Sequence, residues 1–183
     1  MNKNSITIST ETENLLLKLS KELTDAKKAE QRKAIDSVSP YSKQINNAIN
    51  KYSEFFLYYS LNLREAFVTR PALIKEIDFD MWVSCECKTN RQLIQEGQSP
   101  YAYDAEDGKI EVHHIGQEYD APFAELTINE HKFYGNSSIL HEVKKESWRQ
   151  DKKKFATFNS ERQEHWRKRL SGEFNLMPVP EFK

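Results

Sequence analysis

One stretch in the second half of the chain constrains the fold more than any other. Residues 110–113, Ile-Glu-Val-His, alternate apolar and polar side chains, as a strand with one buried face does. A loop containing Gly and Pro follows, and residues 123–127 form a second short segment with strand character. Thr127 or Asn129 can then cap a helix that carries His131. The pattern predicts a β-hairpin followed by a helix.

Histidines are concentrated in the same region. Four of the five histidines in the chain lie within 33 positions, and a glutamate precedes the first of them by two residues. Clustered imidazoles beside carboxylates suit a metal site or acid–base chemistry. Strand alternation places Glu111 and His113 on one face and His114 on the other. The two remaining members of the cluster are His131 and His141.

The spacing of the last two histidines makes a further prediction. On one unbroken helix, His141 would lie ten residues and about 15 Å beyond His131, which is too far for both to bind one ion. Gly135-Asn136 is a break signal between them. If both histidines are ligands, the chain must fold back at this break.

The first half of the chain, residues 1–97, has the pattern of a helical module. Apolar residues recur at helical spacing after a capping signal at Thr10, which predicts a helix to about residue 35. Ser39-Pro40 begins a second helical pattern that runs to about residue 63, and a third runs from about residue 71 to residue 94. This module carries no catalytic constellation, so we expect it to be structural or to bind a partner.

Composition favours helix over an all-β fold. The chain has only five Gly and six Pro, with 38% hydrophobic and 30% charged residues. No apolar run approaches the ~18 residues of a membrane span, and no Sec-type signal is visible, so we expect no membrane association. Cys85 and Cys87 are expected to be reduced thiols in a helix. The predicted fold class is α+β, mostly α.

The formal net charge of −1 hides an uneven distribution. Residues 99–140 carry two Lys/Arg and eight Asp/Glu, whereas residues 141–172 carry ten and five. An acidic, histidine-bearing segment followed by a basic one suits a cation site beside a polyanion-binding surface. Ser160 with Gln163 predicts the start of a basic helix, and residues 173–183 an extended tail. The basic side chains expected to contact nucleic acid are those of Lys152, Lys153, Lys154, Arg162, Arg167, Lys168 and Arg169.

The histidine-bearing region resembles the HNH/endonuclease VII superfamily of nucleases. More narrowly, it looks like the LHH-type nuclease domains at the C-termini of bacterial polymorphic toxins. The resemblance covers about residues 97–172 and is carried by Glu111-Val112-His113-His114, Gln117, Glu125-Leu126-Thr127, His131, Asn136 and Leu140-His141, with Val112 where those domains usually have leucine.

This resemblance implies a ββα-metal fold over residues 98–172 that binds one divalent cation. It implies that His113 is a metal ligand, that His114 is the general base acting on water, and that His131 is a second ligand. Glu111 matches an acidic residue of colicin-type nucleases and is expected to orient a histidine or a basic side chain.

One position departs from the family pattern. Four residues after His131, where colicin-type enzymes have their last ligand, this chain has Gly135. The third ligand is therefore expected to be His141 or Asn136. We favour His141 because imidazole suits the ions concerned, while Asn136 can instead pin the loop or supply an oxygen ligand.

The expected function is a metal-dependent endonuclease that acts on DNA, with RNA an open alternative and Mg²⁺, Mn²⁺, Ni²⁺ or Zn²⁺ as the ion. The resemblance suggests a bacterial toxin neutralised by an immunity protein and acting in the cytoplasm of the producing or target cell. A stand-alone defence nuclease is one alternative. Another is a non-catalytic module closed by zinc at His113, His131 and His141, and a third is an interaction protein with core histidines. We expect His165 to be a core histidine in any of these cases.

Overall fold

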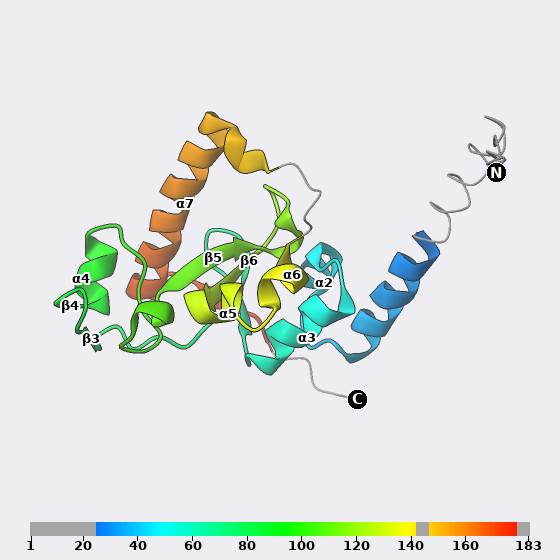
Figure 1. The fold of residues 1–183 in the computed structure, drawn as a ribbon, viewed down its shortest axis with the longest axis horizontal. Helices are drawn as coiled ribbons and strands as arrows, with labels where there is room; N and C mark the ends of the chain where they lie inside the picture. The colour runs from blue at the N-terminus through cyan, green and yellow to red at the C-terminus, as the bar shows by residue number, and fades with distance from the viewer. Residues whose placement is uncertain (1–24, 142–146, 179–183) are drawn as a thin grey trace, which may run out of the picture.

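The computed structural model describes residues 25–141 and 147–178 (Figure 1). A five-stranded sheet forms its centre, with the strand order β5-β6-β2-β1-β7. Neighbouring strands are antiparallel except β2 and β6, which are parallel. The strands are β1 (Arg64–Phe67), β2 (Pro71–Ile74), β5 (Ile110–His114), β6 (Phe123–Thr127) and β7 (Asn175–Leu176). Two further strands, β3 (Trp82–Val83) and β4 (Lys88–Thr89), form a separate hairpin.

Helices cover both faces of the sheet, and about half of the molecule is helical. A helix over residues 25–38 comes first in the described part of the chain. It is followed by α2 (Lys43–Ala48), α3 (Tyr52–Ser60), α4 (Asn90–Gln95), α5 (Ile128–Lys132), α6 (Asn136–Leu140) and α7 (Lys152–Ser171). Three short 3₁₀ turns are η1 (Glu106–Gly108), η2 (Ile115–Gln117) and η3 (Trp148–Gln150). The architecture is mixed α and β, as the sequence predicts for an HNH-like nuclease domain.

Two hydrophobic clusters lie on opposite faces of the sheet. On one face, Leu73 of β2 and Leu126 of β6 pack with apolar residues of α2, α3 and α6. On the other, Val112 of β5 and Phe123 of β6 pack with α7. Because side chains alternate along a strand, the face that a residue occupies is fixed by its parity. The same alternation places the side chains of His113 and His114 on opposite faces of the sheet.

The predicted hairpin and helix are confirmed. β5 and β6 pair as an antiparallel hairpin, in which His113 lies opposite Ala124 and His114 opposite Phe123. Thr127 caps α5 directly after β6, and its capping box with Glu130 satisfies the first free N–H groups of the helix. The chain therefore changes from strand to helix where the capping residue stands.

The expectation of an all-helical module over residues 1–97 is wrong for residues 64–89. β1 and β2 join the central sheet, so the sheet takes strands from both sides of residue 97. Residues 72–74 are all buried, because β2 has β1 and β6 as neighbours and a hydrophobic cluster on each face. A short continuous apolar run of this kind cannot be distinguished from a buried helix by its periodicity. Helix within the expected 71–94 stretch is limited to α4.

The helix expected from Ser39 to residue 63 is divided into α2 and α3. Ser42 caps α2, whereas Ser39 uses its hydroxyl to donate to Asn46. Cys85 and Cys87 are exposed free thiols, as expected, but they lie in the turn between β3 and β4 and not in a helix. The capping signal at Thr10 lies outside the described residues.

The C-terminal helix is longer than its sequence signal suggests. α7 begins at Lys152 with Asp151 as its cap, so Ser160 lies in its interior and donates to the Ala156 carbonyl. Part of the expected extended tail pairs with β1 as β7, and residues 179–183 lie outside the described part. Within the described residues, no helix has the length and apolar character needed to cross a membrane.

Candidate metal centre

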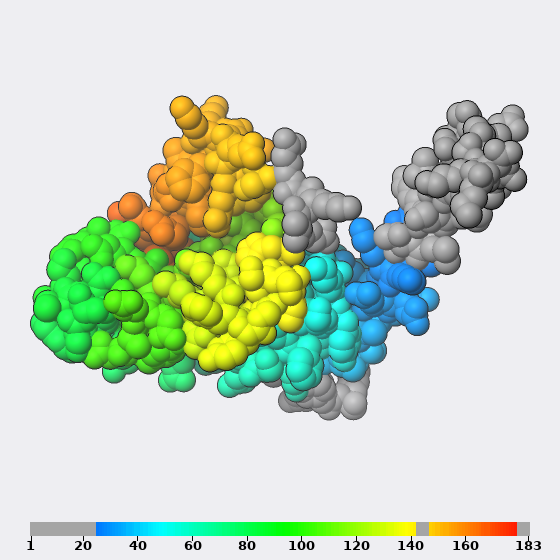
Figure 2. Space-filling view, in the orientation of Figure 1, coloured from blue at the N-terminus to red at the C-terminus, as the bar shows by residue number. Residues whose placement is uncertain are grey.

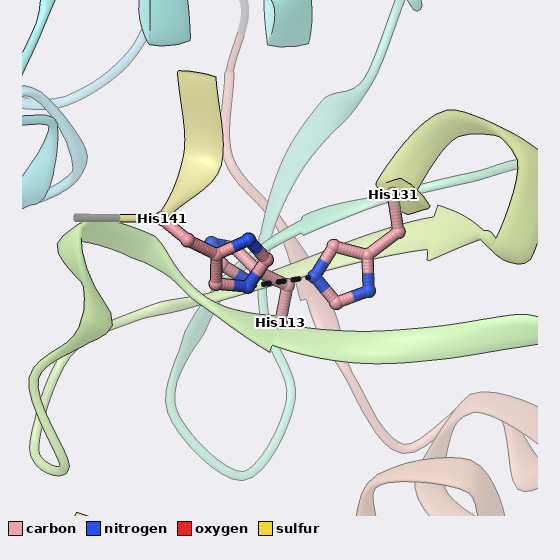
Figure 3. A group of neighbouring side chains, drawn as sticks. All are labelled: His113, His131 and His141. Atoms are coloured by element: carbon pink, nitrogen blue, oxygen red, sulfur yellow. Dashed lines mark hydrogen bonds between the residues drawn. The ribbon is translucent and has the colours of Figure 1, made fainter. Parts of the chain in front are cut away.

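Three histidines from three separate elements converge beside the hairpin. His113 comes from β5, His131 from α5, and His141 directly follows α6 (Figure 3). Their ring centroids are 4.9 to 5.3 Å apart, and one nitrogen of each lies within 4.8 Å of the others. His113 and His131 are buried, and His141 is partly exposed. Within the described residues this is the only group of three or more His, Cys, Asp or Glu side chains that could hold one ion.

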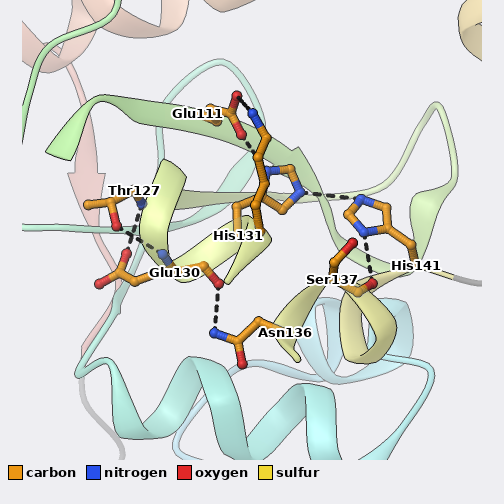
Figure 4. Close-up of polar contacts among 8 residues, drawn as sticks. Glu111, Thr127, Glu130, His131, Asn136, Ser137 and His141 are labelled. Atoms are coloured by element: carbon orange, nitrogen blue, oxygen red, sulfur yellow. Dashed lines mark hydrogen bonds and ion pairs between the residues drawn. The ribbon is translucent and has the colours of Figure 1, made fainter. Parts of the chain in front are cut away.

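Glu111 holds the imidazole of His131 in place (Figure 4). His131 Nδ1 donates to the Glu111 carboxylate over 2.6 Å, and Lys132 Nζ donates to the other carboxylate oxygen over 2.8 Å. The hydrogen bond from His131, against the effect of partial burial and with help from Lys132, lowers the pKa of Glu111 to about 2. Glu111 therefore orients both a histidine and a basic side chain, which the sequence left as alternatives.

A turn at Gly135 brings His141 back to His131. Gly135 has a φ of 79°, a left-handed conformation that glycine adopts without a Cβ clash, and α6 starts directly after it. His141 Nδ1 donates to the Ser137 carbonyl over 3.0 Å, and the Nε2 atoms of His131 and His141 lie 3.3 Å apart. The fold-back required for both histidines to reach one ion is present.

Asn136 lies elsewhere. Its side-chain amide donates to the Glu130 carbonyl over 2.8 Å, which ties the start of α6 to the end of α5 (Figure 4). Figure 4 shows this amide pointing away from the rings of His131 and His141. The structure thus brings together His113, His131 and His141 and uses Asn136 to hold the loop.

The nitrogen atoms have the chemistry of a metal site. A carboxylate and a carbonyl can only accept hydrogen bonds, so Nδ1 of His131 and Nδ1 of His141 each carry a proton, and the two Nε2 atoms face each other. Two nitrogens bound to one tetrahedral ion at about 2.0–2.1 Å lie about 3.3 Å apart. The observed separation is 3.3 Å.

His113 supports the same fit. Its Nε2 atom is buried and has no hydrogen-bond partner, which is costly for a polar atom unless a ligand completes it. Burial first, and then the neighbouring imidazoles, lower the pKa of His113 well below its usual value, so the ring is neutral. A neutral, desolvated imidazole is the form that binds a metal ion.

His114 lies on the opposite face of β5, within an aromatic cage. Its ring centroid is 4.7 Å from that of Trp148 and 4.8 Å from those of Phe123 and Phe158. Burial first, and then the charges of Arg70 and Arg149, lower its pKa to about 3. The imidazole is therefore neutral near pH 7 and can accept a proton.

The two faces of β5 meet at one cleft where the strand ends. A cavity of about 110 Å³ there is lined by His113, His114, Gln117, His141, Ser147, Trp148 and Arg149. The separate histidine and two members of the three-histidine cluster thus open onto the same space. Arg149, which lies 5.6 Å from the ring of Trp148, adds a positive charge to it.

The basic residues expected to contact nucleic acid are distributed unevenly. Lys152, Lys153, Lys154 and Arg167 are exposed on α7, and Arg162 and Lys168 are partly exposed. The prediction that Arg169 contacts nucleic acid is wrong. Its side chain is buried, with 5% exposed, and it donates to the buried Glu125 carboxylate and to the Lys75 carbonyl. A guanidinium committed to a buried ion pair is a structural element and not a surface contact.

His165 belongs to the same buried group. It is fully buried, and its Nε2 atom lies 2.8 Å from Glu125 Oε1. Burial alone would raise the pKa of Glu125, but the hydrogen bond with His165 and the charge of Arg169 outweigh it and lower the pKa. His165 is therefore a core histidine with a partner, as expected.

Sequence reasoning missed three residues of the cleft, Ser147 and the pair Trp148 and Arg149. Both stand in the basic segment, but they precede α7 in the short turn η3 and carried no motif signal. Their position follows from the packing of η3 and α7, in which Trp148 contacts Phe158 at a ring distance of 5.5 Å. A contact of this kind between non-periodic residues is not visible in a single sequence.

Comparison with known families agrees with this geometry. Residues 89–172 match the model of the LHH family, described as a nuclease of the HNH/ENDO VII superfamily with conserved LHH. This part of the chain is therefore similar to the LHH family. The match includes β5, β6, α5, α6 and α7, and therefore every residue of the candidate centre. No solved structure matches the chain.

The match to this nuclease family supports hydrolase activity on nucleic acids and dependence on a divalent metal. The family pattern has leucine before the histidine pair, where this chain has Val112. Val112 is buried against α7, where a branched apolar side chain fills the same role in the core.

Proposed function

We propose that this protein is a metal-dependent endonuclease that hydrolyses phosphodiester bonds in DNA. The observation that carries the proposal is the shared cleft. On one face of β5, three imidazoles have the spacing of a metal site, and on the other a neutral imidazole opens onto the same cavity. The match to a nuclease family supports the reaction class. The resemblance of the sequence to toxin nucleases leads us to favour DNA over RNA.

His113, His131 and His141 would hold one divalent ion. When bound, such an ion supplies charge stabilisation at the scissile phosphate and assistance to the leaving oxygen. Three protein ligands leave coordination positions open for substrate, as catalytic sites do. Imidazole ligands suit Zn²⁺ or Ni²⁺, while Mg²⁺ and Mn²⁺ prefer oxygen ligands, so we expect the tightest binding with the first two.

His114 would act as the general base. The aromatic cage keeps the ring neutral and fixes its orientation, so a ring nitrogen can take the proton from a water in the cleft. The proton taken from that water would reside on the imidazole while the phosphodiester is cleaved. Arg149, on the wall of the same cleft, would offset the negative charge that develops on the phosphate.

A metal-dependent cleavage assay tests the proposal. Supercoiled plasmid is incubated with the protein and Mg²⁺, Mn²⁺, Ni²⁺ or Zn²⁺, with EDTA as the control. We expect His114→Ala to lower the rate of nicking by about 10²-fold or more, since general-base catalysis contributes about 10²–10⁴-fold. This variant should still bind the metal ion. His113→Ala should instead weaken metal binding itself. Undiminished cleavage by the His114→Ala variant would refute the assignment of the base.

A non-catalytic module closed by zinc would use the same three histidines. It gives no role to the cavity beside them or to the separate imidazole of His114. Absence of cleavage of both DNA and RNA by the unaltered protein with every ion would favour this module over the nuclease.

For the biological role, we propose a bacterial toxin that acts in the cytoplasm and is neutralised by an immunity protein, on the basis of the family resemblance. A stand-alone defence nuclease would have the same site. Growth arrest on expression, reversed by the product of a neighbouring gene and absent with His114→Ala, would support the toxin. Expression without an effect on growth would favour the alternative.

A further inference from the structure

A second cleft lies beside the candidate metal centre, between α7 and the β5–α5 edge. It has a volume of about 310 Å³ and is lined by residues of both walls. Figure 2 shows the face concerned, hollowed between the orange surface of α7 and the yellow surface of α5 and α6. Its lining contains one acidic residue, Glu111, and four basic residues, Lys109, Lys132, Arg149 and Arg162.

The acidic residue does not neutralise this surface. Both carboxylate oxygens of Glu111 are already engaged, one by His131 and one by Lys132. Lys109 pairs with Glu86, which lies outside the lining. The cations that remain are Arg149 and Arg162.

Neither arginine has an anionic partner among the described residues. The Nε atom of Arg162 is buried and makes no hydrogen bond. The Arg149 guanidinium lies against the rings of Trp148 and Phe158, at 5.6 and 5.9 Å, and makes no ion pair within that same part of the chain. Arg149 is exposed, whereas Arg162 is partly buried. A guanidinium with a buried Nε and no acceptor is costly, so the retention of Arg162 is explained best by an anionic ligand that binds there.

Arg149 connects the two clefts. It lines both the cavity that contains His113 and His114 and the larger cleft that contains Arg162. His131, whose ring contributes to the metal centre, also lines the larger cleft. An extended ligand with a repeating negative charge can therefore occupy both at once, and a nucleic-acid strand is a ligand of that kind.

We propose that the α7–β5 cleft binds a phosphodiester that flanks the scissile one, with Arg162 as its main contact and Arg149 between the two phosphates. The inference rests on the proposed nuclease function. It adds the path of the substrate strand over the protein surface, which runs along the face of α7 that carries Arg162. Guanidinium groups form bidentate hydrogen bonds to phosphate, which suits this role.

Binding measured without divalent ions tests the proposal separately from cleavage. A short fluorescein-labelled DNA is titrated in EDTA by fluorescence anisotropy at several salt concentrations. Arg162→Gln should weaken binding about tenfold to a hundredfold, the loss expected for one charge-assisted contact. The slope of log affinity against log salt should fall by about one. Arg162→Lys, which retains the charge, should keep the slope.

Arg91→Gln is the matched control, because it also removes one arginine charge from an exposed site that does not line the cleft. It should leave affinity and slope unchanged. The melting temperature should not fall for Arg162→Gln, since the side chain it replaces makes no hydrogen bond or ion pair within the described residues. In cleavage with metal present, Arg162→Gln should raise KM and leave kcat nearly unchanged, because the contact lies away from the reacting atoms.

The outcomes are distinct. If the protein cleaves DNA but Arg162→Gln binds with the affinity and salt slope of Arg91→Gln, the flanking subsite is wrong and the nuclease function stands. A lower kcat with unchanged KM would also overturn it, since that places Arg162 at the reacting phosphate. If the unaltered protein neither binds nor cleaves DNA or RNA, both the subsite and the proposed function fail.

Discussion

Glu111→Gln is the substitution that best tests whether the three histidines form a metal site. Glu111 accepts a 2.6 Å hydrogen bond from His131 Nδ1, which keeps the proton there and leaves Nε2 free to face His141. Glutamine has nearly the same shape and can still accept that hydrogen bond, but it removes the negative charge that makes the imidazole a better ligand. Loss of such a partner weakens metal affinity about 10- to 100-fold, or about 1.4–2.7 kcal/mol.

Metal affinity can be measured directly by competition with a chromophoric chelator, with Zn²⁺ and Ni²⁺ in separate titrations. Glu106→Gln is the matched control, because it makes the same chemical change at an exposed position on the neighbouring turn η1. The melting temperatures of both variants without metal show whether either has lost its fold. If Glu111→Gln binds both ions as tightly as Glu106→Gln, then Glu111 does not support a ligand and the proposed site is wrong.

Two further substitutions test the loop and the buried ion pairs. Asn136→Ala should leave metal affinity unchanged and cost about 1 kcal/mol of stability from the lost hydrogen bond to the Glu130 carbonyl, whereas His141→Ala should strongly weaken metal binding. Comparable loss of metal in both variants would make Asn136 a ligand. Glu125→Gln should destabilise the fold by about 3–5 kcal/mol, because it leaves the buried Arg169 without its counter-charge. Since the folded-state pKa of Glu125 is lowered, its contribution is present above the unfolded pKa of about 4.3 and is lost as pH falls below it. Urea unfolding at neutral and acid pH measures this, and a variant whose stability equals that of the unaltered protein at neutral pH would contradict it.

The hairpin and the helix after it were predictable because their signals are local. Alternation marks β5, and Thr127 with Glu130 forms a capping box whose spacing is visible in the sequence. Gly135 likewise marks the turn that returns His141 to His131. Each of these features depends on residues a few positions apart, so a single sequence contains them.

The strands of the first half could not be predicted in the same way. β2 is a central strand because β6, which comes about fifty residues later, pairs with it in parallel, and a hydrophobic cluster covers each of its faces. The apolar run at residues 72–74 has the same appearance in a buried helix, and only the distant partner decides between them. The division of residues 39–63 into α2 and α3 likewise depends on packing, since Glu54 of α3 accepts from the Gly116 N–H of η2.

Within the candidate site, the sequence pattern identified the histidines, but it did not predict whether the charged residues near them are buried or paired. Whether Arg169 lies at the surface or in a buried ion pair depends on Glu125 of β6, and no local pattern connects the two. The same limit applies to Arg162, whose lack of a partner is a property of the assembled cleft. Identity of a charged residue is local information, and its pairing is not.

His113 and His114 have different environments because side chains alternate along a strand. Helix α7 supplies part of the aromatic surroundings of His114. His113 faces the helices that carry the other two imidazoles, whereas His114 faces Phe158 of α7. α7 is in turn fixed to the sheet by Glu125 of β6, which binds both His165 and Arg169. Because Glu125 is two residues from Phe123 on the same strand, one short segment sets both the anchor of α7 and the aromatic wall against His114. Loosening that anchor should therefore disturb the orientation of the proposed base before it disturbs the three-histidine cluster, which is held by α5 and α6.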